Sequence, residues 1–170
     1  SDIFTIQEIK KKSISKLKLC WIGDANNNMM NSLVEACIKF SVYLNIACPK
    51  SYQPNKKLIS LIKKQKGKIK IFNKKEIAIK NSDVVMTDKI ISLNDKVNKK
   101  KKLKSFKNFK VDTKTMNLAK KDAIFLHCLP RGNEVTEEVF LGKQSKVWQQ
   151  ALNRVYVQKS ILLYCFGKLR

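Results

Sequence analysis

The chain has 170 residues, of which 44% are hydrophobic, and a formal net charge of +23. This length and hydrophobic content allow a buried core, which excludes a disordered protein, and the apolar runs are too short to cross a bilayer. Positive charge favours a nucleic-acid partner. However, only three of the 36 basic residues are arginine, the residue preferred for bidentate phosphate and base contacts. We therefore expect neither a nucleic-acid nor a membrane partner.

The five cysteines are an odd number, and no two of them form a C-x-x-C pair. This pattern argues against a disulfide framework or a zinc site and favours a reducing compartment. The first twelve residues carry Asp2 and Glu8 and lack the apolar segment of a signal peptide. The sequence thus predicts a cytoplasmic location.

Apolar periodicity divides the chain into alternating helices and strands. Residues 1–12 have the spacing of the end of a helix. Strands are predicted at residues 17–22, 43–48, 68–72, 83–87 and 123–126. Helical segments are predicted up to about residue 40, and at residues 56–66, 75–80, 95–106, 113–118, 136–140 and 149–166. Such alternation is typical of βαβ units, so the sequence predicts an α/β fold: a Rossmann-like parallel sheet of about five strands with helices on both faces.

Three of these helices have apolar or charged patterns that predict their orientation. The helix ending near residue 40 has a predicted buried stripe of Val34, Cys37, Ile38 and Ser41. The lysines at 99–102 are expected on the solvated face of their helix. The last helix has its apolar residues on helical spacing: Ala151, Val155, Ile161, Leu162 and Cys165.

The first predicted strand ends in Gly23 and an Asn-rich turn, GDANNNMMNS. Side-chain amides at a strand-to-helix turn can cap the helix or donate hydrogen bonds to an anion. The turn lacks the G-x-G-x-x-G pattern, which argues against a nicotinamide cofactor. The fourth strand ends before Asp88, where a carboxylate can hold a substrate ammonium, with Ser92 four residues on. A simple helix cap and an ordinary loop aspartate remain the alternatives.

The fifth predicted strand ends in His127 and Cys128, followed by Leu-Pro-Arg-Gly. Reactive groups just past the carboxyl end of a buried strand occupy the usual ligand position of open α/β sheets. A structural histidine and a cysteine that only packs are the alternatives. Together, Asn28, Asp88, Ser92 and Cys128 offer amides for a carboxylate, a carboxylate for an amine and a thiol at the reacting end. That set suits an amino-acid substrate.

The motifs GDANNNMMNS, SDVVMTD with the following Ser92, FLHCLPRGNEVTEEVF and ALNRVYVQKSIL, in this order and spacing, resemble the ornithine carbamoyltransferase family. The resemblance runs from about Asp2 to the end of the chain and concerns the C-terminal, ornithine-binding domain of that family. It implies that residues 1–15 are the end of an interdomain linking helix and residues 16–170 the ornithine-binding domain. The family's N-terminal carbamoyl phosphate domain is not in this sequence, so we expect the chain to be inactive alone.

The resemblance also implies roles for individual residues. It assigns ornithine binding to Asn28, Asp88, Ser92 and Leu93. It assigns carbamoyl phosphate binding to Cys128, Leu129 and Arg154, and catalysis to Cys128 and His127. A cis Leu129–Pro130 peptide is part of the same pattern. The substrate-closing loop departs from the family, because Ser92-Leu93-Asn94 stands where the family has Ser-Met-Gly.

The implied reaction is the transfer of the carbamoyl group of carbamoyl phosphate to L-ornithine, which gives L-citrulline and phosphate, as in arginine biosynthesis. It needs no metal or organic cofactor, and the family forms trimers. A Cys128 thiolate beside the δ-amine would take or orient its proton, and His127 and backbone amides would stabilise the oxyanion. Putrescine or N-acetylornithine carbamoyltransferases are alternatives, although the retained Asn28, Asp88 and Ser92 favour ornithine. A non-catalytic basic Rossmann-like binding module is the other alternative.

Overall fold

The computed structural model describes residues 1–91 and 98–168. Its centre is a sheet of five strands in the order β3-β2-β1-β4-β5, and every neighbouring pair is parallel. The strands are β1 (Lys18–Ile22), β2 (Tyr43–Ala47), β3 (Ile69–Phe72), β4 (Val84–Thr87) and β5 (Ile124–His127). This arrangement confirms the predicted α/β fold, and the strand boundaries agree with the predicted ones within one residue.

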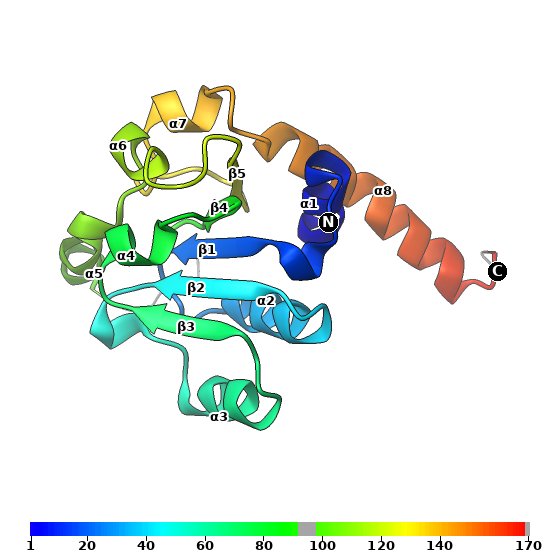
Figure 1. Ribbon diagram of the computed structural model, residues 1–170, viewed down its shortest axis with the longest axis horizontal. Helices are drawn as coiled ribbons and strands as arrows, with labels where there is room; N and C mark the ends of the chain where they lie inside the picture. The colour runs from blue at the N-terminus through cyan, green and yellow to red at the C-terminus, as the bar shows by residue number, and fades with distance from the viewer. Residues whose placement is uncertain (92–97, 169–170) are drawn as a thin grey trace.

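Helices follow the strands in the predicted alternation (Figure 1). The α-helices are α1 (Asp2–Lys10), α2 (Asn28–Lys39), α3 (Lys56–Lys64), α4 (Lys75–Ile79), α5 (Lys99–Phe106), α6 (Thr113–Met116), α7 (Glu137–Leu141) and α8 (Val147–Cys165). Short 3-10 turns are η1 (Ile14–Lys16), η2 (Lys50–Tyr52) and η3 (Lys107–Phe109). The helix predicted at 95–106 begins at Lys99, after the N-cap Asn98, and residues 95–97 lie outside the described residues.

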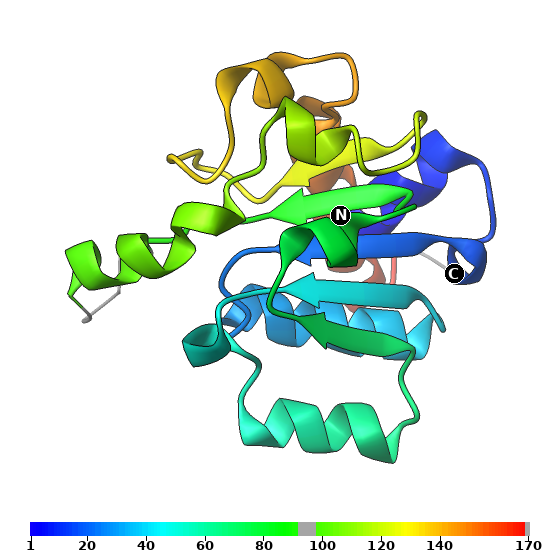
Figure 2. The same ribbon diagram turned by 60° about the vertical axis from the view of Figure 1, so that its left-hand side comes forward.

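Two apolar clusters cover the two faces of the sheet, as the alternation of side chains along a strand requires. Leu19 and Trp21 of β1 pack with apolar residues of α1, α2 and α3. Cys20 and Ile22, on the opposite face of the same strand, pack with residues of α4, α5, α6 and α7. The sheet is therefore buried on both sides, and in Figure 2 the blue helix α2 lies behind the strands and the green helix α4 lies in front of them.

The order of the strands creates a switch point beside β1. From β1 the chain first adds β2 and β3 on one side, and then returns to add β4 and β5 on the other. Adjacent loops after β1 and β4 therefore diverge at the carboxyl edge of the sheet, where open α/β sheets bind ligands. The Thr87 hydroxyl donates to the carbonyl of Ile22 at 2.6 Å and joins these two strand ends. A Cβ on Gly23, whose φ is +152°, would lie 3.3 Å from that hydroxyl oxygen.

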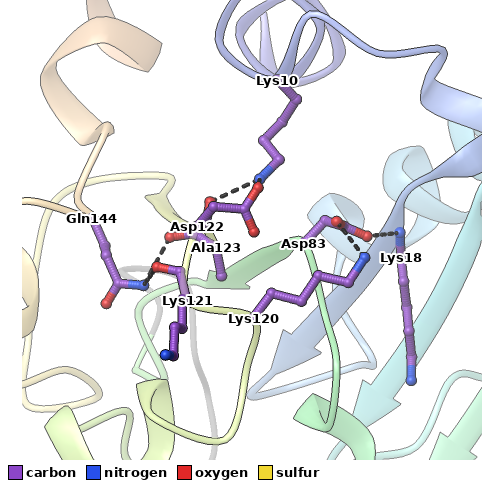
Figure 3. A network of polar contacts seen from close by, with 8 residues as sticks. All are labelled: Lys10, Lys18, Asp83, Lys120, Lys121, Asp122, Ala123 and Gln144. Carbon is purple, nitrogen blue, oxygen red and sulfur yellow. Dashed lines mark hydrogen bonds and ion pairs between the residues drawn. The ribbon is translucent and has the colours of Figure 1, made fainter.

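At the opposite edge of the sheet, buried Asp83 joins β1 to β4. Its carboxylate accepts the backbone N–H of Lys18 at 2.9 Å and pairs with the Lys120 ammonium at 2.7 Å (Figure 3). Near by, the Gln144 amide donates to the carbonyl of Ala123 at 2.9 Å. Side-chain hydrogen bonds thus join β1 and β4 at both ends of the strand pair.

Two predictions of helix orientation need correction. Lys102 is only 4% exposed, because it lies one turn before Phe106 on the inward face of α5, and its ammonium pairs with Asp24 at 2.7 Å. In α2, Val34 and Cys37 are buried as predicted, but Ser41 is exposed beyond the end of the helix.

The apolar residues of α8 do not form a buried stripe. Val155, Ile161 and Leu162 are 55–59% exposed, and the buried residues of this helix are Val147, Gln150 and Asn153. The reason is visible in Figure 1, where the second half of α8 extends past the sheet. No helix among the described residues is both long enough and apolar enough to cross a membrane.

Candidate functional site

Asn28 is the first residue of α2, directly after β1 and its turn. The preceding residue, Asn27, caps the helix: its side-chain oxygen accepts the N–H of Met30 at 2.8 Å, and its amide donates to the carbonyl of Asp24 at 3.2 Å. Asn28 itself is exposed at the carboxyl edge of the sheet. The two amides therefore divide between helix capping and a solvent-facing position, as the local chemistry of an N-terminus requires.

Asp88 follows β4 and is half-buried. Burial raises the pKa of its carboxyl group, and the charges of Glu134 and Asp24 add to this, while the N–H of Lys89 and the His127 ring act in the opposite direction. The Lys89 N–H donates to Asp88 Oδ1 at 2.7 Å. A partly desolvated carboxylate of this kind gains from a cationic partner, which makes it suited to an ammonium group.

Cys128 follows β5, two strands away from β1. Burial raises the pKa of its thiol well above the usual value, and the charges of Asp88 and Asp2 raise it further. The neutral thiol is thus the resting form at neutral pH, in contrast to the thiolate that we expected. Thr87 and His127 are register partners in β4 and β5, so Asp88 and Cys128 follow paired residues at the ends of neighbouring strands.

We expect alkylation by iodoacetamide at mildly alkaline pH to modify Cys165 much faster than Cys128. Cys165 is exposed, whereas burial and two carboxylates oppose the reactive thiolate of Cys128. The variant Asp88→Asn removes one of these charges and should accelerate modification of Cys128 at least about threefold. Peptide mass spectrometry over time measures both rates, and an unchanged Cys128 rate in the variant would refute the coupling.

His127 is fully buried, and both of its ring nitrogens are hydrogen-bonded within the protein. Nε2 lies 3.0 Å from Oε1 of Glu134, and Nδ1 accepts the backbone N–H of Leu129 at 2.9 Å. The ring therefore holds the loop after β5 in place. This arrangement differs from our expectation that His127 donates directly to the substrate, because its donor is already directed at Glu134.

Glu134 belongs to the candidate site, although no pattern in the sequence indicated it. It is 3% exposed and accepts hydrogen bonds from the His127 ring and from the N–H of Gly132. Burial raises the pKa of Glu134, but these hydrogen bonds outweigh it and the pKa lies below the usual value. The available signal was the need of a buried histidine for an acidic or carbonyl partner, and Glu134 is a nearby acid in the same loop.

The residues expected to contact carbamoyl phosphate lie around one cavity. Cys128, Leu129 and Arg154 line a space of about 450 Å³ between the end of β5, α1 and α8. Arg154 is exposed, so its guanidinium is accessible to an anion. The Leu129–Pro130 peptide is cis, which confirms that expectation. Ser92, Leu93 and Asn94 lie outside the described residues.

Possible metal ligands are scattered across the fold. Within residues 1–91 and 98–168, no three side chains of His, Cys, Asp or Glu are grouped so that they could hold a metal ion. The carboxyl ends of β1, β4 and β5 are followed by an amide (Asn28), a carboxylate (Asp88) and a thiol (Cys128). Cys128 also shares its cavity with the Arg154 guanidinium, whereas Asn28 and Asp88 do not line that cavity. The chemistry of these four groups matches an amino acid and an anion.

Comparison with known proteins places the chain in context. A family model described as "Aspartate/ornithine carbamoyltransferase, Asp/Orn binding domain" matches residues 15–165. The ornithine carbamoyltransferase of Methanococcus maripaludis is 44% identical over 174 residues, which cover 98% of this chain and 57% of the relative. That of Methanosarcina acetivorans is 37% identical, with 95% and 54% covered. The chain thus spans about half the length of the curated relatives that it matches.

Solved structures give the same result. The anabolic ornithine carbamoyltransferase of Campylobacter jejuni superposes with a TM-score of 0.89 at 38% identity, covering 98% of this chain and 57% of that one. The ornithine carbamoyltransferase of Pyrococcus furiosus superposes with a TM-score of 0.87 at 34% identity, covering 99% and 55%. The strand order and both helical layers are thus shared with these structures over nearly the whole chain.

Proposed function

The chain belongs to the aspartate/ornithine carbamoyltransferase family, and we propose that it forms the ornithine-binding part of an ornithine carbamoyltransferase. One observation carries the proposal: Asn28, Asp88 and Cys128 follow three adjacent strands and lie at the same edge of the sheet. They offer an amide, a carboxylate and a thiol, which match the two ends of an amino acid. The whole enzyme would convert carbamoyl phosphate and L-ornithine to L-citrulline and phosphate.

The proposed roles follow the chemistry of each group. The Asp88 carboxylate binds the α-ammonium of ornithine, and Asn28, together with Ser92 and Leu93, orients its α-carboxylate end. The δ-ammonium first loses a proton to solvent. The free amine then attacks the carbamoyl carbon, a C–N bond forms, the C–O bond to phosphate breaks, and the proton released by the nitrogen passes to the departing phosphate. As a neutral thiol, Cys128 orients this amine through weak hydrogen bonds to sulfur.

Charge that develops during the reaction needs fixed partners. Arg154 binds the departing phosphate, for which its planar guanidinium is suited. His127 acts by positioning, because its ring holds the N–H of Leu129 and keeps the Cys128–Leu129 backbone against the cavity. The residues of this chain thus bind, orient and stabilise, and no step requires a cofactor.

We further propose that the carbamoyl phosphate domain of the enzyme docks along α1 and α8. Helix α8 and Phe166, which follows it, expose large apolar side chains: Leu152, Val155, Tyr156, Ile161, Leu162, Tyr164 and Phe166. Phe4 of α1 and Ile161 of α8 line an apolar groove of about 350 Å³. Exposed apolar patches of this kind mark interfaces. In this proposal residues 1–15 end the linking helix, residues 16–170 form the ornithine domain, and the enzyme is a cytoplasmic homotrimer.

A titration of the isotope-labelled chain, followed by two-dimensional NMR, tests the substrate. We expect L-ornithine to shift the amide signals of residues around Asn28, Asp88 and Cys128, with a weak affinity on the order of millimolar because half of the site belongs to the other domain. Putrescine, which lacks the α-ammonium and α-carboxylate, should shift them much less, as should N-acetylornithine.

The alternatives have distinct outcomes in the same experiment. If putrescine or N-acetylornithine shifted the amide signals as much as L-ornithine does, that compound would be the proposed substrate in place of ornithine. Tight binding of a nucleic acid at physiological salt, with no response to any of the three amines, would instead favour a basic binding module. A lysine-rich surface binds phosphate without specificity, so salt dependence is measured in parallel.

A further inference from the structure

Helices α1 and α8 lie side by side (Figure 1). Polar side chains join them. The Asn153 amide, 1% exposed, donates to Thr5 Oγ1 at 3.0 Å and to Glu8 Oε2 at 2.8 Å. The Gln149 amide donates to the same Glu8 oxygen at 3.3 Å. These hydrogen bonds are directional, so a helix that slides along such an interface leaves buried polar groups without partners, at a cost of about 1–3 kcal/mol each.

Gln150 connects this interface to the backbone of His127 and Cys128 at the end of β5. It is 5% exposed, its Oε1 accepts the backbone N–H of His127 at 2.9 Å, and its Nε2 donates to Asp2 Oδ1 at 2.9 Å. One side chain of α8 therefore joins the first turn of α1 to the last residue of β5. Cys128 is the next residue in the chain.

The other end of α1 is attached to the other end of the same strand. The Lys10 ammonium, on a side chain 4% exposed, donates to the carbonyl of Asp122 at 2.7 Å and pairs with its carboxylate at 2.8 Å (Figure 3). Asp122 precedes β5, whereas His127 ends it. The nine-residue helix is about 13 Å long and the segment from 122 to 127 about 17 Å, so the attachments bracket the whole strand.

We propose that Gln150 is a positioning residue, which fixes the His127–Cys128 backbone relative to α1. The inference rests on the proposed function in so far as Cys128 carries the reaction. Any movement of α1 along its axis must either break the Gln150–Asp2 hydrogen bond or pull on the His127 N–H. The Gln150 side-chain amide therefore links the position of α1 to the backbone geometry of His127 and Cys128.

The variant Gln150→Met removes both hydrogen bonds at similar volume. We expect hydrogen exchange of the His127 amide, alkylation of Cys128 and the dissociation constant of L-ornithine each to rise about tenfold. The double variant Gln150→Glu with Asp2→Asn exchanges donor and acceptor between the two positions and keeps the net charge. It should return all three quantities close to the values of the unmodified chain.

Gln149→Met is the matched control, because it makes the same chemical change one residue away in the same interface. It should lower the free energy of unfolding while leaving the exchange of the His127 amide and the alkylation of Cys128 unchanged. The proposal is overturned if Gln150→Met affects only stability, as the control does, or if the stable double variant still behaves like Gln150→Met. Should ornithine bind none of the chains, the exchange and alkylation rates still decide the inference separately from the proposed function.

Discussion

Replacing Asp88 by alanine is expected to weaken L-ornithine binding by about 10- to 100-fold, which corresponds to about 1.5–3 kcal/mol for a hydrogen bond to a charged group. Asp88 is half-buried beside the switch point, where its carboxylate is partly desolvated. A substrate ammonium group bound there compensates the lost hydration of the carboxylate. Alanine removes the carboxylate and leaves the ammonium group without its partner. The NMR titration with L-ornithine measures the change, and Asp88→Asn, which removes only the charge, should behave similarly.

The pKa of Asp88 adds a dependence on pH. Because burial raises this pKa above its usual value of 3.8, the carboxylate takes up a proton at a higher pH than an exposed aspartate does. Affinity for ornithine should therefore fall as the pH decreases toward the raised pKa, while exposed carboxylates are still ionised.

The control for Asp88→Ala is Glu35→Ala, which removes an exposed negative charge from α2 and should change the affinity for ornithine little. Equal losses in both variants would point to the overall charge instead of a contact.

Lys102→Met is expected to lower the free energy of unfolding by about 3–5 kcal/mol, the usual cost of removing one partner of a buried ion pair. The Lys102 and Asp24 side chains are only 5% and 9% exposed, and their charged atoms lie 2.7 Å apart. Methionine keeps most of the volume of lysine but leaves Asp24 without its cation. Since domains unfold at a cost of about 5–15 kcal/mol, urea unfolding should show a large shift of the midpoint.

Two companion variants make this prediction specific. Lys104→Met, on the exposed side of the same helix, should change the unfolding midpoint only slightly. The double variant Lys102→Met with Asp24→Leu removes both charges and should recover most of the lost stability, because an apolar pair can replace a buried ion pair. If Lys104→Met and Lys102→Met were equally destabilising, helix propensity would explain the effect and the ion pair would not.

Most of the fold could be predicted from the sequence because its signals are local. The apolar strands and the helices between them carry their own periodicity, and α/β connectivity then leaves few arrangements. The position of His127 and Cys128 at the end of a buried strand was also predictable, since polar residues after a buried strand stand out. Asn28 and Asp88 were placed at the same edge by the same reasoning.

The misjudged residues depend on partners that no local pattern reveals. Lys102 belongs to a run of lysines and is buried only because Asp24, distant in sequence, lies opposite it. Gln150 and Asn153 replace apolar residues on the inner face of α8 because α1 presents oxygens there. The apolar residues of α8 have helical spacing, but no local pattern shows that the second half of this helix extends past the sheet.

The all-parallel sheet has a consequence for how the chain reaches this structure. The strand β1 pairs with β2 and β4, and its contact with β4 joins Leu19 to Val84 across most of the first half of the chain. During synthesis β1, β2 and β3 can associate first, while one edge of the most buried strand stays open until β4 has emerged. An unpaired apolar edge is a site of aggregation, and such distant pairings fold slowly. Once β4 has paired with β1, the Asp83 carboxylate accepts the N–H of Lys18 at the start of the pair. The Thr87 hydroxyl donates to the carbonyl of Ile22 at its end.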